Sequence, residues 1–62
     1  MEKVYIVMAA DADEGDVYAL DVHAAATEYD IAQAIIDKDT ADGQIISGVI
    51  VPLKLYSSID DI

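Results

Sequence analysis

The hydrophobic and polar positions of the chain fall into three strand-like runs and one helical run. Residues 3–10 are rich in Val, Ile and Tyr and are apolar on both alternating faces, which is typical of a strand in the middle of a sheet. Residues 17–23 alternate more clearly between apolar and polar positions. The polar segment 11–16 between these runs contains Gly15 and predicts a hairpin loop.

A helix is predicted to follow the second strand. Thr27-Glu28-Tyr29-Asp30 resembles a capping box, with Thr27 as the N-cap and Asp30 at the third helical position. The apolar residues that follow recur at helical spacing: Ile31, Ala32, Ile35 and Ile36. We expect the helix to run to about Asp37 or Lys38, and Asp42-Gly43 to mark the end of the connection.

The last apolar run, residues 44–56, is rich in β-branched residues and predicts a third strand. Pro52 cannot donate to a ladder, so it indicates an edge strand or a bulge, and Gly48 is a second candidate bulge point. We predict that residues 1–56 form a single domain and that residues 57–62 form a short, acidic, mobile tail.

The order of these elements predicts an α+β fold of the type ββαβ. The most uniformly apolar run is placed in the middle, which gives a three-stranded antiparallel sheet in the order 2-1-3 with one helix packed on one face. Neither the first nor the last strand has a polar face, and one helix cannot bury both faces of the sheet. We therefore expect the open face, or an edge, to be covered by a second copy of the chain or by a partner.

The charge of the chain narrows the classes of partner. Thirteen Asp and Glu residues stand against three Lys and no Arg, which gives a formal net charge of −10. This charge argues against direct binding to nucleic acid, which needs Lys and Arg at the phosphates, and against anionic membranes. A protein with a basic surface is the natural complement. Adaptation to high salt, or a solvated surface without any partner, would account for the same composition.

Length and cysteine content limit how the fold can be stabilised. A 62-residue domain buries only about 60% of its unfolded surface, so its stability is marginal. The absence of cysteine excludes disulfides and thiolate metal sites, which leaves oligomerisation, a hard-metal site or an unusually well-packed apolar core. The apolar run near the N-terminus is too short for a membrane span and lacks a basic leader, so we expect a cytoplasmic protein.

Two groups of residues have the composition of a metal site but not its spacing. The loop Asp11-x-Asp13-x-Gly15-Asp16 resembles the start of a calcium loop, but Asp16 and Val22 stand where an EF-hand has Gly and Glu. Asp21 and His23 share one strand face, but the chain has no second His and no Cys to complete a zinc site. We predict no metal and no cofactor.

Catalytic arrangements are also missing from the sequence. The serines share a single His, and neither a nucleophile elbow nor a Gly-rich phosphate loop occurs. A domain of this size has little room for an enclosed pocket of typical ligand volume. We predict that the protein is not an enzyme.

The acidic residues form three groups: the hairpin loop, the helix with its exit, and the tail. Together with the size of the chain, the missing cysteine and the order of elements, this profile resembles the small acidic inhibitors encoded by phages, such as DNA mimics and anti-CRISPR proteins. The resemblance covers no specific residues, so no functional residue is carried over from it. It implies a module that blocks a basic surface of a nucleic-acid-handling protein in the host cytoplasm.

For this function we predict two sets of partner-binding residues. The acidic set comprises Asp11, Asp13, Glu14 and Asp16 of the loop and Asp37, Asp39 and Asp42 of the helix exit. The apolar or aromatic set comprises Tyr5, Val7 and Tyr56. The alternative is a structural homodimer or small subunit that associates through its apolar sheet face or edge, with acidity serving only solubility or salt adaptation.

Overall fold

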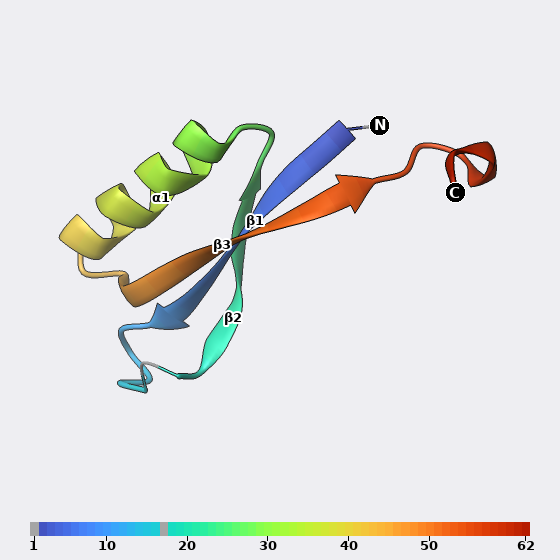
Figure 1. The fold of residues 1–62 in the computed structure, drawn as a ribbon. Helices are drawn as coiled ribbons and strands as arrows, with labels where there is room; N and C mark the ends of the chain where they lie inside the picture. Colours follow the sequence, from blue (N-terminus) through green and yellow to red (C-terminus); the bar gives the residue numbers. More distant parts are fainter. Residues whose placement is uncertain (1, 17) are drawn as a thin grey trace.

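A computed structural model describes residues 2–16 and 18–62 and confirms the predicted ββαβ topology. Strand β1 (Glu2–Asp11) lies in the middle of the sheet, between β2 (Leu20–Ala26) and β3 (Ile45–Leu55). Both neighbours are antiparallel to β1, so the order is β2-β1-β3. Helix α1 (Tyr29–Ala41) lies over one face of the sheet (Figure 1).

Strand β2 begins three residues later than the sequence pattern predicts. Val17, the predicted first residue, lies outside the described residues, and Tyr18 is in a turn. Two hydrogen bonds to Asp16 extend the hairpin loop: its Oδ1 accepts the Tyr18 N–H at 2.9 Å, and its carbonyl accepts the Ala19 N–H at 3.2 Å. Short Asp side chains compete in this way with ladder bonds, so the loop lengthens at the expense of the strand.

A β-bulge interrupts β2 at its centre. Val7 pairs with Ala24 and Met8 pairs with Val22, which leaves His23 as the extra residue of β2. Bulges of this kind redirect a side chain and disrupt the simple alternation of faces. Because of the bulge, the direction of the His23 side chain does not follow the simple alternation of faces that the sequence predicts.

The helix begins later and ends later than predicted. Its N-cap is Glu28, which makes no side-chain cap hydrogen bond, so the prediction that Thr27 caps the helix is wrong. The first helical bond runs from the Ala32 N–H to the Glu28 carbonyl at 3.2 Å. Packing fixes this start, because Ala32 is fully buried against the sheet and Tyr29 stacks edge-to-face on Tyr5.

A Schellman motif ends α1 at Ala41, beyond the predicted end. The Gly43 N–H donates to the Thr40 carbonyl at 3.1 Å, and the Gln44 N–H donates to the Asp39 carbonyl at 2.9 Å. Gly43 has a φ of +77°, a conformation that favours glycine. The motif turns the chain directly into β3.

The core lies between α1 and the covered face of the sheet. Val7, Ala26 and Ala32 form its centre, and partly buried side chains pack around them: Tyr5, Ala24, Ile35, Ile36 and Ile50. Pro52 lies in an edge strand, as predicted. Gly48 is not a bulge point, because it pairs regularly with Ala9; the irregularity of β3 falls between the Ala10–Ser47 and Asp11–Ile45 pairs.

The molecule is elongated. The radius of gyration is 13.2 Å, compared with about 10.6 Å for a compact domain of this length. The start of β1 and the end of β3 extend beyond β2 as a two-stranded arm, and the 3₁₀ helix η1 (Ile59–Asp61) follows that arm (Figure 1). The mobility of residues 57–62 stays a prediction.

Candidate functional site

The hairpin loop and the helix exit, which are far apart in the sequence, meet at one end of the sheet. The Ala12 N–H donates to the Gln44 carbonyl at 3.1 Å, and Asp11 pairs with Ile45 at the end of the β1–β3 ladder. These contacts place the acidic loop beside the segment that leaves α1. The two acidic groups predicted separately from the sequence therefore belong to one region of the surface.

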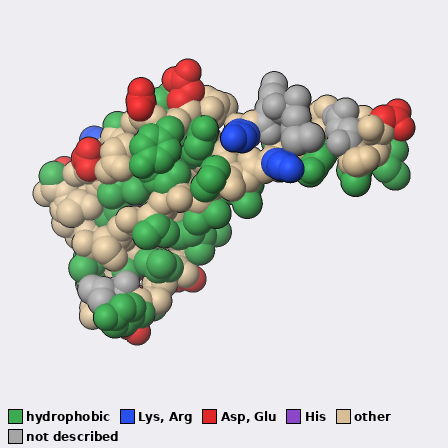
Figure 2. Space-filling model, viewed as in Figure 1, with side chains coloured by type: hydrophobic (Ala, Val, Ile, Leu, Met, Phe, Trp, Pro, Cys, Tyr) green, Lys and Arg blue, Asp and Glu red, His purple; other side chains and the backbone are tan. Residues whose placement is uncertain are grey.

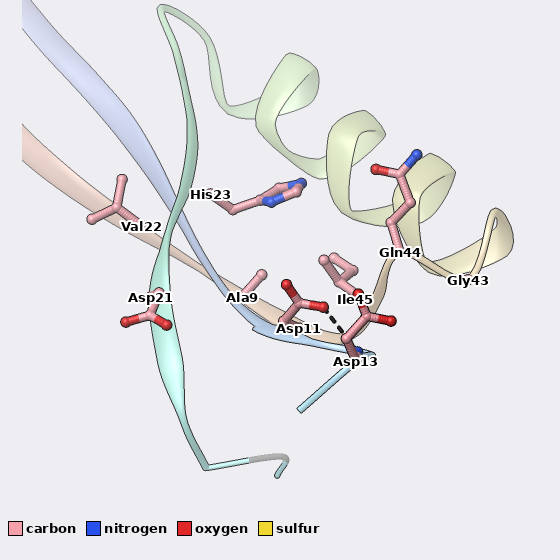
Figure 3. Close-up of a pocket in the computed structure, with 9 residues that line it drawn as sticks. All are labelled: Ala9, Asp11, Asp13, Asp21, Val22, His23, Gly43, Gln44 and Ile45. Carbon is pink, nitrogen blue, oxygen red and sulfur yellow. Dashed lines mark hydrogen bonds between the residues drawn. The ribbon is translucent and has the colours of Figure 1, made fainter. Parts of the chain in front are cut away.

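A pocket of about 410 Å³ lies between the loop, β2 and the connection from α1 to β3. Its volume falls within the range of small-ligand sites, and the pocket is partly open to solvent, whereas the sequence-based expectation concerns an enclosed pocket. The lining, drawn in Figure 3, consists of Ala9, Asp11, Asp13, Asp21, Val22, His23, Gly43, Gln44 and Ile45.

Three carboxylates dominate the chemistry of the pocket. Asp11 and Asp13 come from the loop, and Asp21 comes from β2, where it pairs with Ala9. The Asp11 Oδ1 accepts the backbone N–H of Asp13 at 2.9 Å, which holds the first turn of the loop in place (Figure 3). Among the described residues of the lining, none is a lysine. The pocket therefore offers a concentration of negative charge with room for a cationic group.

His23 connects the strand side of the pocket to the helix. Its Nε2 lies 2.5 Å from the Asp39 Oδ2, and the two side chains are 27% and 16% exposed. The bulge at His23 allows this contact to form, because the ring points from β2 toward α1 (Figure 3). Asp39 is thus engaged with the wall of the pocket, although its carboxylate is not part of the lining.

The other predicted acidic residues are not brought into the pocket. Glu14 and Asp16 are exposed in the loop outside the lining, and Asp42 is the exposed C-cap residue of α1. Asp37 is exposed on α1, where its Oδ1 accepts a hydrogen bond from Gln33 Nε2 at 3.0 Å. Of the seven predicted acidic positions, the structure gathers Asp11 and Asp13 in the lining and Asp39 behind it.

The predicted apolar and aromatic set, Tyr5, Val7 and Tyr56, does not line the pocket. Val7 is 0% exposed beneath α1, so its side chain offers nothing to a partner in this fold. Tyr5 is partly buried, with its ring centroid 5.9 Å from that of Tyr29. Tyr56 is exposed but follows the end of β3, at the opposite end of the sheet from the pocket. The sequence pattern could not distinguish the covered face of β1 from the open one.

Several residues that bear on the site were missed or set aside by sequence reasoning. Asp21 and His23 were recognised as a pair on β2, but nothing in the sequence placed them beside the hairpin loop. Tyr18, which was assigned to a strand, lies in the loop and is 90% exposed. The signal for Tyr18 was present, because Asp16 two residues earlier is a common acceptor in such turns.

Two of the three lysines lie away from the pocket, whereas Lys38 lies in the last turn of α1, beside the helix exit. Lys3 and Lys54 are cross-strand partners on the two-stranded arm, eight residues along β1 from Asp11 and so about 26 Å away. Figure 2 shows two blue side chains lying together at the base of this arm. The molecule is therefore electrically polar, with the acidic pocket at one end of the sheet and two lysines at the other.

Within residues 2–16 and 18–62, no group of three or more His, Asp or Glu side chains is arranged to hold a metal ion. In the same residues, no helix has the length and apolar character needed to cross a membrane. Comparison with protein-family models, with curated proteins and with solved structures found no match.

Proposed function

We propose that this chain is a protein-binding module whose acidic pocket receives Lys or Arg side chains from the basic surface of a partner protein. The observation that carries this proposal is that carboxylates from two separate segments, Asp11 and Asp13 of the loop and Asp21 of β2, line one pocket without a lysine in its described lining. A guanidinium or ammonium group forms charge-assisted hydrogen bonds with such oxygens.

The surroundings of the pocket support contact with a protein. Tyr18 projects from the same hairpin loop, and an exposed tyrosine is a frequent anchor in protein interfaces. The remaining acidic residues of the loop and the helix exit would extend a negative field around the pocket, which steers a basic partner toward it. Direct binding to nucleic acid or to an anionic membrane is not part of the proposal, because the same field repels both.

The biological form we propose is an inhibitor or adaptor that occupies a basic groove of a nucleic-acid-handling protein. The sequence profile resembles phage-encoded inhibitors of the DNA-mimic or anti-CRISPR type, and such a module would act in the cytoplasm, the host's if it is phage-encoded. We assign it no catalytic role, since the single His of the chain is held against Asp39 and the sequence offers no nucleophile–base pair.

The test measures binding of a fluorescent hexa-arginine peptide by anisotropy, in 50 and 200 mM salt. Replacing Asp11, Asp13 and Asp21 with Asn removes three charges but keeps an oxygen acceptor at each position. We expect the affinity to fall about tenfold, from roughly 0.5 kcal/mol for each exposed charge pair, and the salt dependence to become shallower.

A matched control removes the same number of charges elsewhere on the chain. The variant Glu28→Gln/Asp30→Asn/Asp60→Asn changes the net charge equally but leaves the pocket lining intact. We expect it to retain most of the affinity. Equal losses in the two variants would mean that only net charge matters, and the proposal of a binding pocket would then be wrong.

A further inference from the structure

The face of the sheet opposite α1 is apolar and uncovered. Alternation along the paired strands assigns twelve described side chains to this open face, of which only Ser47 is polar: Val4, Ile6, Met8, Ala10, Leu20, Val22, Ala25, Ser47, Val49, Val51, Leu53 and Leu55. The strand pairing makes the surface continuous, because Ile6 of the central strand lies between Ala25 of β2 and Val51 of β3. Six of the large apolar side chains among them are markedly exposed, and Val22 is 69% exposed, whereas Ala10 is buried.

The core beneath α1 is small for a fold that has to stand alone. The buried apolar residues of the described chain are Val7, Ala9, Ala10, Ala26, Ala32 and Ile45, four of which are alanines. Among the described residues, Val7 is the only large side chain that is fully buried. The accessible surface is 4433 Å², whereas a compact monomer of 6.6 kDa exposes about 3,900 Å². The chain thus leaves exposed to solvent the apolar surface that a domain of this size needs to bury.

The extent of the open face approaches the smallest area expected of a specific protein interface. The strands have 10, 7 and 11 residues. Each strand residue covers about 16 Å² of sheet, from a strand spacing of about 4.8 Å and a rise of about 3.3 Å, so one face measures roughly 450 Å². Two such faces in contact bury about 900 Å² of flat area, and the protruding side chains add to this accessible surface. The value is close to the roughly 1,000 Å² expected of a specific interface.

The charge distribution favours a second copy as the occupant. None of the described side chains of the open face is charged, and the acidic residues of the pocket lie on the helix side and at one end of the sheet. A partner attracted by charge would approach the pocket and not this face. Two copies can bring their open faces together without burying a carboxylate, and the contact is self-complementary under two-fold symmetry.

We propose that a second copy of this chain covers the open face and forms a homodimer with the layers helix, sheet, sheet and helix. The two sheets would pack about 10 Å apart, as in other face-to-face sandwiches. The carboxylates of the pocket lie on the helix side of each sheet, and Val22 is the one lining residue shared with the open face, so the dimer would present two pockets. This inference does not depend on what the pocket binds.

The experiment measures the mass of the purified chain by sedimentation equilibrium over a range of protein concentrations, in 50 and 500 mM NaCl. We expect a dimer of twice 6.6 kDa that tightens as salt rises, because salt screens the repulsion between two chains of charge −10. Binding of a basic peptide at the pocket weakens as salt rises, so failure of one proposal is distinguishable from failure of the other. A folded monomer at every concentration and salt would overturn the inference.

The variant Val51→Lys places a cation in the middle of the open face while lowering the net negative charge. We expect the dimer dissociation constant to rise at least about tenfold, because the lysine must be desolvated in the interface. Ile59→Lys changes the charge equally on the exposed 3₁₀ helix, and we expect it to leave the constant unchanged. Equal effects of the two variants would contradict an interface on this face.

A measurement on the unmodified chain decides the question if Val51→Lys fails to fold. Isotope-filtered NOE spectra of a mixture of labelled and unlabelled protein report contacts between the two copies only. We expect them between methyl groups of Val22, Val49, Val51 and Leu53, and none from Ile36 beneath α1. Contacts between copies that arise from α1 or from the arm in place of these methyls would overturn the inference.

Discussion

Ile36 of α1 lies directly over the backbone of Gly48 in β3. A Cβ added to Gly48 would stand 3.0 Å from the Ile36 Cγ1, 3.3 Å from its Cδ1 and 3.4 Å from its Cγ2. Three atoms of one side chain thus occupy the space that any other residue would need. The close approach explains a glycine in the interior of a strand, where glycine is normally disfavoured.

The first prediction concerns this contact. We expect Gly48→Ala to lower the free energy of unfolding by about 1 kcal/mol, because Ile36 must move to admit the methyl group. In an Ile36→Ala background the same substitution should be neutral, or stabilising by up to about 1 kcal/mol, since the strand then loses a flexible glycine. Urea unfolding of the four proteins at one fixed concentration measures the cycle. Equal effects of Gly48→Ala in both backgrounds would contradict the contact.

The position of Gly48 also shows where prediction from the sequence stops. Strand β1, the sheet order and the antiparallel pairing follow from the apolar runs and their spacing along the chain. The role of Gly48 does not, because it depends on which side chain of α1 crosses β3. The same limit applies to Thr27, whose capping sequence is overridden when Ala32 and Tyr29 pack against the sheet.

The candidate site was predictable in part. The acidic character of the hairpin loop and of the helix exit is plain in the sequence. That Asp11 and Asp13 share a pocket with Asp21 depends on the hydrogen bond from Ala12 to Gln44 and on the closing pairs of the sheet. These are tertiary contacts between segments some thirty residues apart, and no local pattern encodes them.

The second prediction concerns the two lysines of the arm. Lys3 and Lys54 are directly opposite each other on β1 and β3, and like charges in such positions repel. We expect either Lys3→Glu or Lys54→Glu alone to raise the free energy of unfolding by about 0.5 kcal/mol, because each creates an exposed ion pair. The double variant should lose this gain, since it restores a like-charged pair.

Thermal or urea unfolding in low and high salt checks this prediction. Each single variant shifts the net charge from −10 to −12, which by itself works against the compact state. If both single variants are destabilised and the double variant is destabilised further, the net charge determines the stability of these variants and the cross-strand pair does not. We also expect the gain of the single variants to shrink in 1 M NaCl.

The third prediction concerns the contact between His23 and Asp39, which joins the bulge of β2 to α1 at the wall of the pocket. Their side chains are only partly exposed and their closest atoms are 2.5 Å apart, so the contact restrains both elements. We expect His23→Gln and Asp39→Asn to show a coupling of about 0.5–1 kcal/mol in a double-mutant cycle of unfolding. Asp37→Asn is the matched control, because Asp37 lies on the same helix and contacts Gln33. His23→Gln and Asp37→Asn should be additive within about 0.3 kcal/mol.

The same contact has a consequence for binding at the pocket. Because His23 lines the pocket and Asp39 holds its ring, loss of Asp39 should loosen the β2 wall without removing a lining carboxylate. We expect Asp39→Asn to weaken binding of the hexa-arginine peptide more than Asp37→Asn does, although both variants remove one charge from α1. Anisotropy titrations of the two variants, side by side at 50 mM salt, measure the difference. Identical affinities would mean that the contact between Asp39 and His23 does not position the pocket wall for binding.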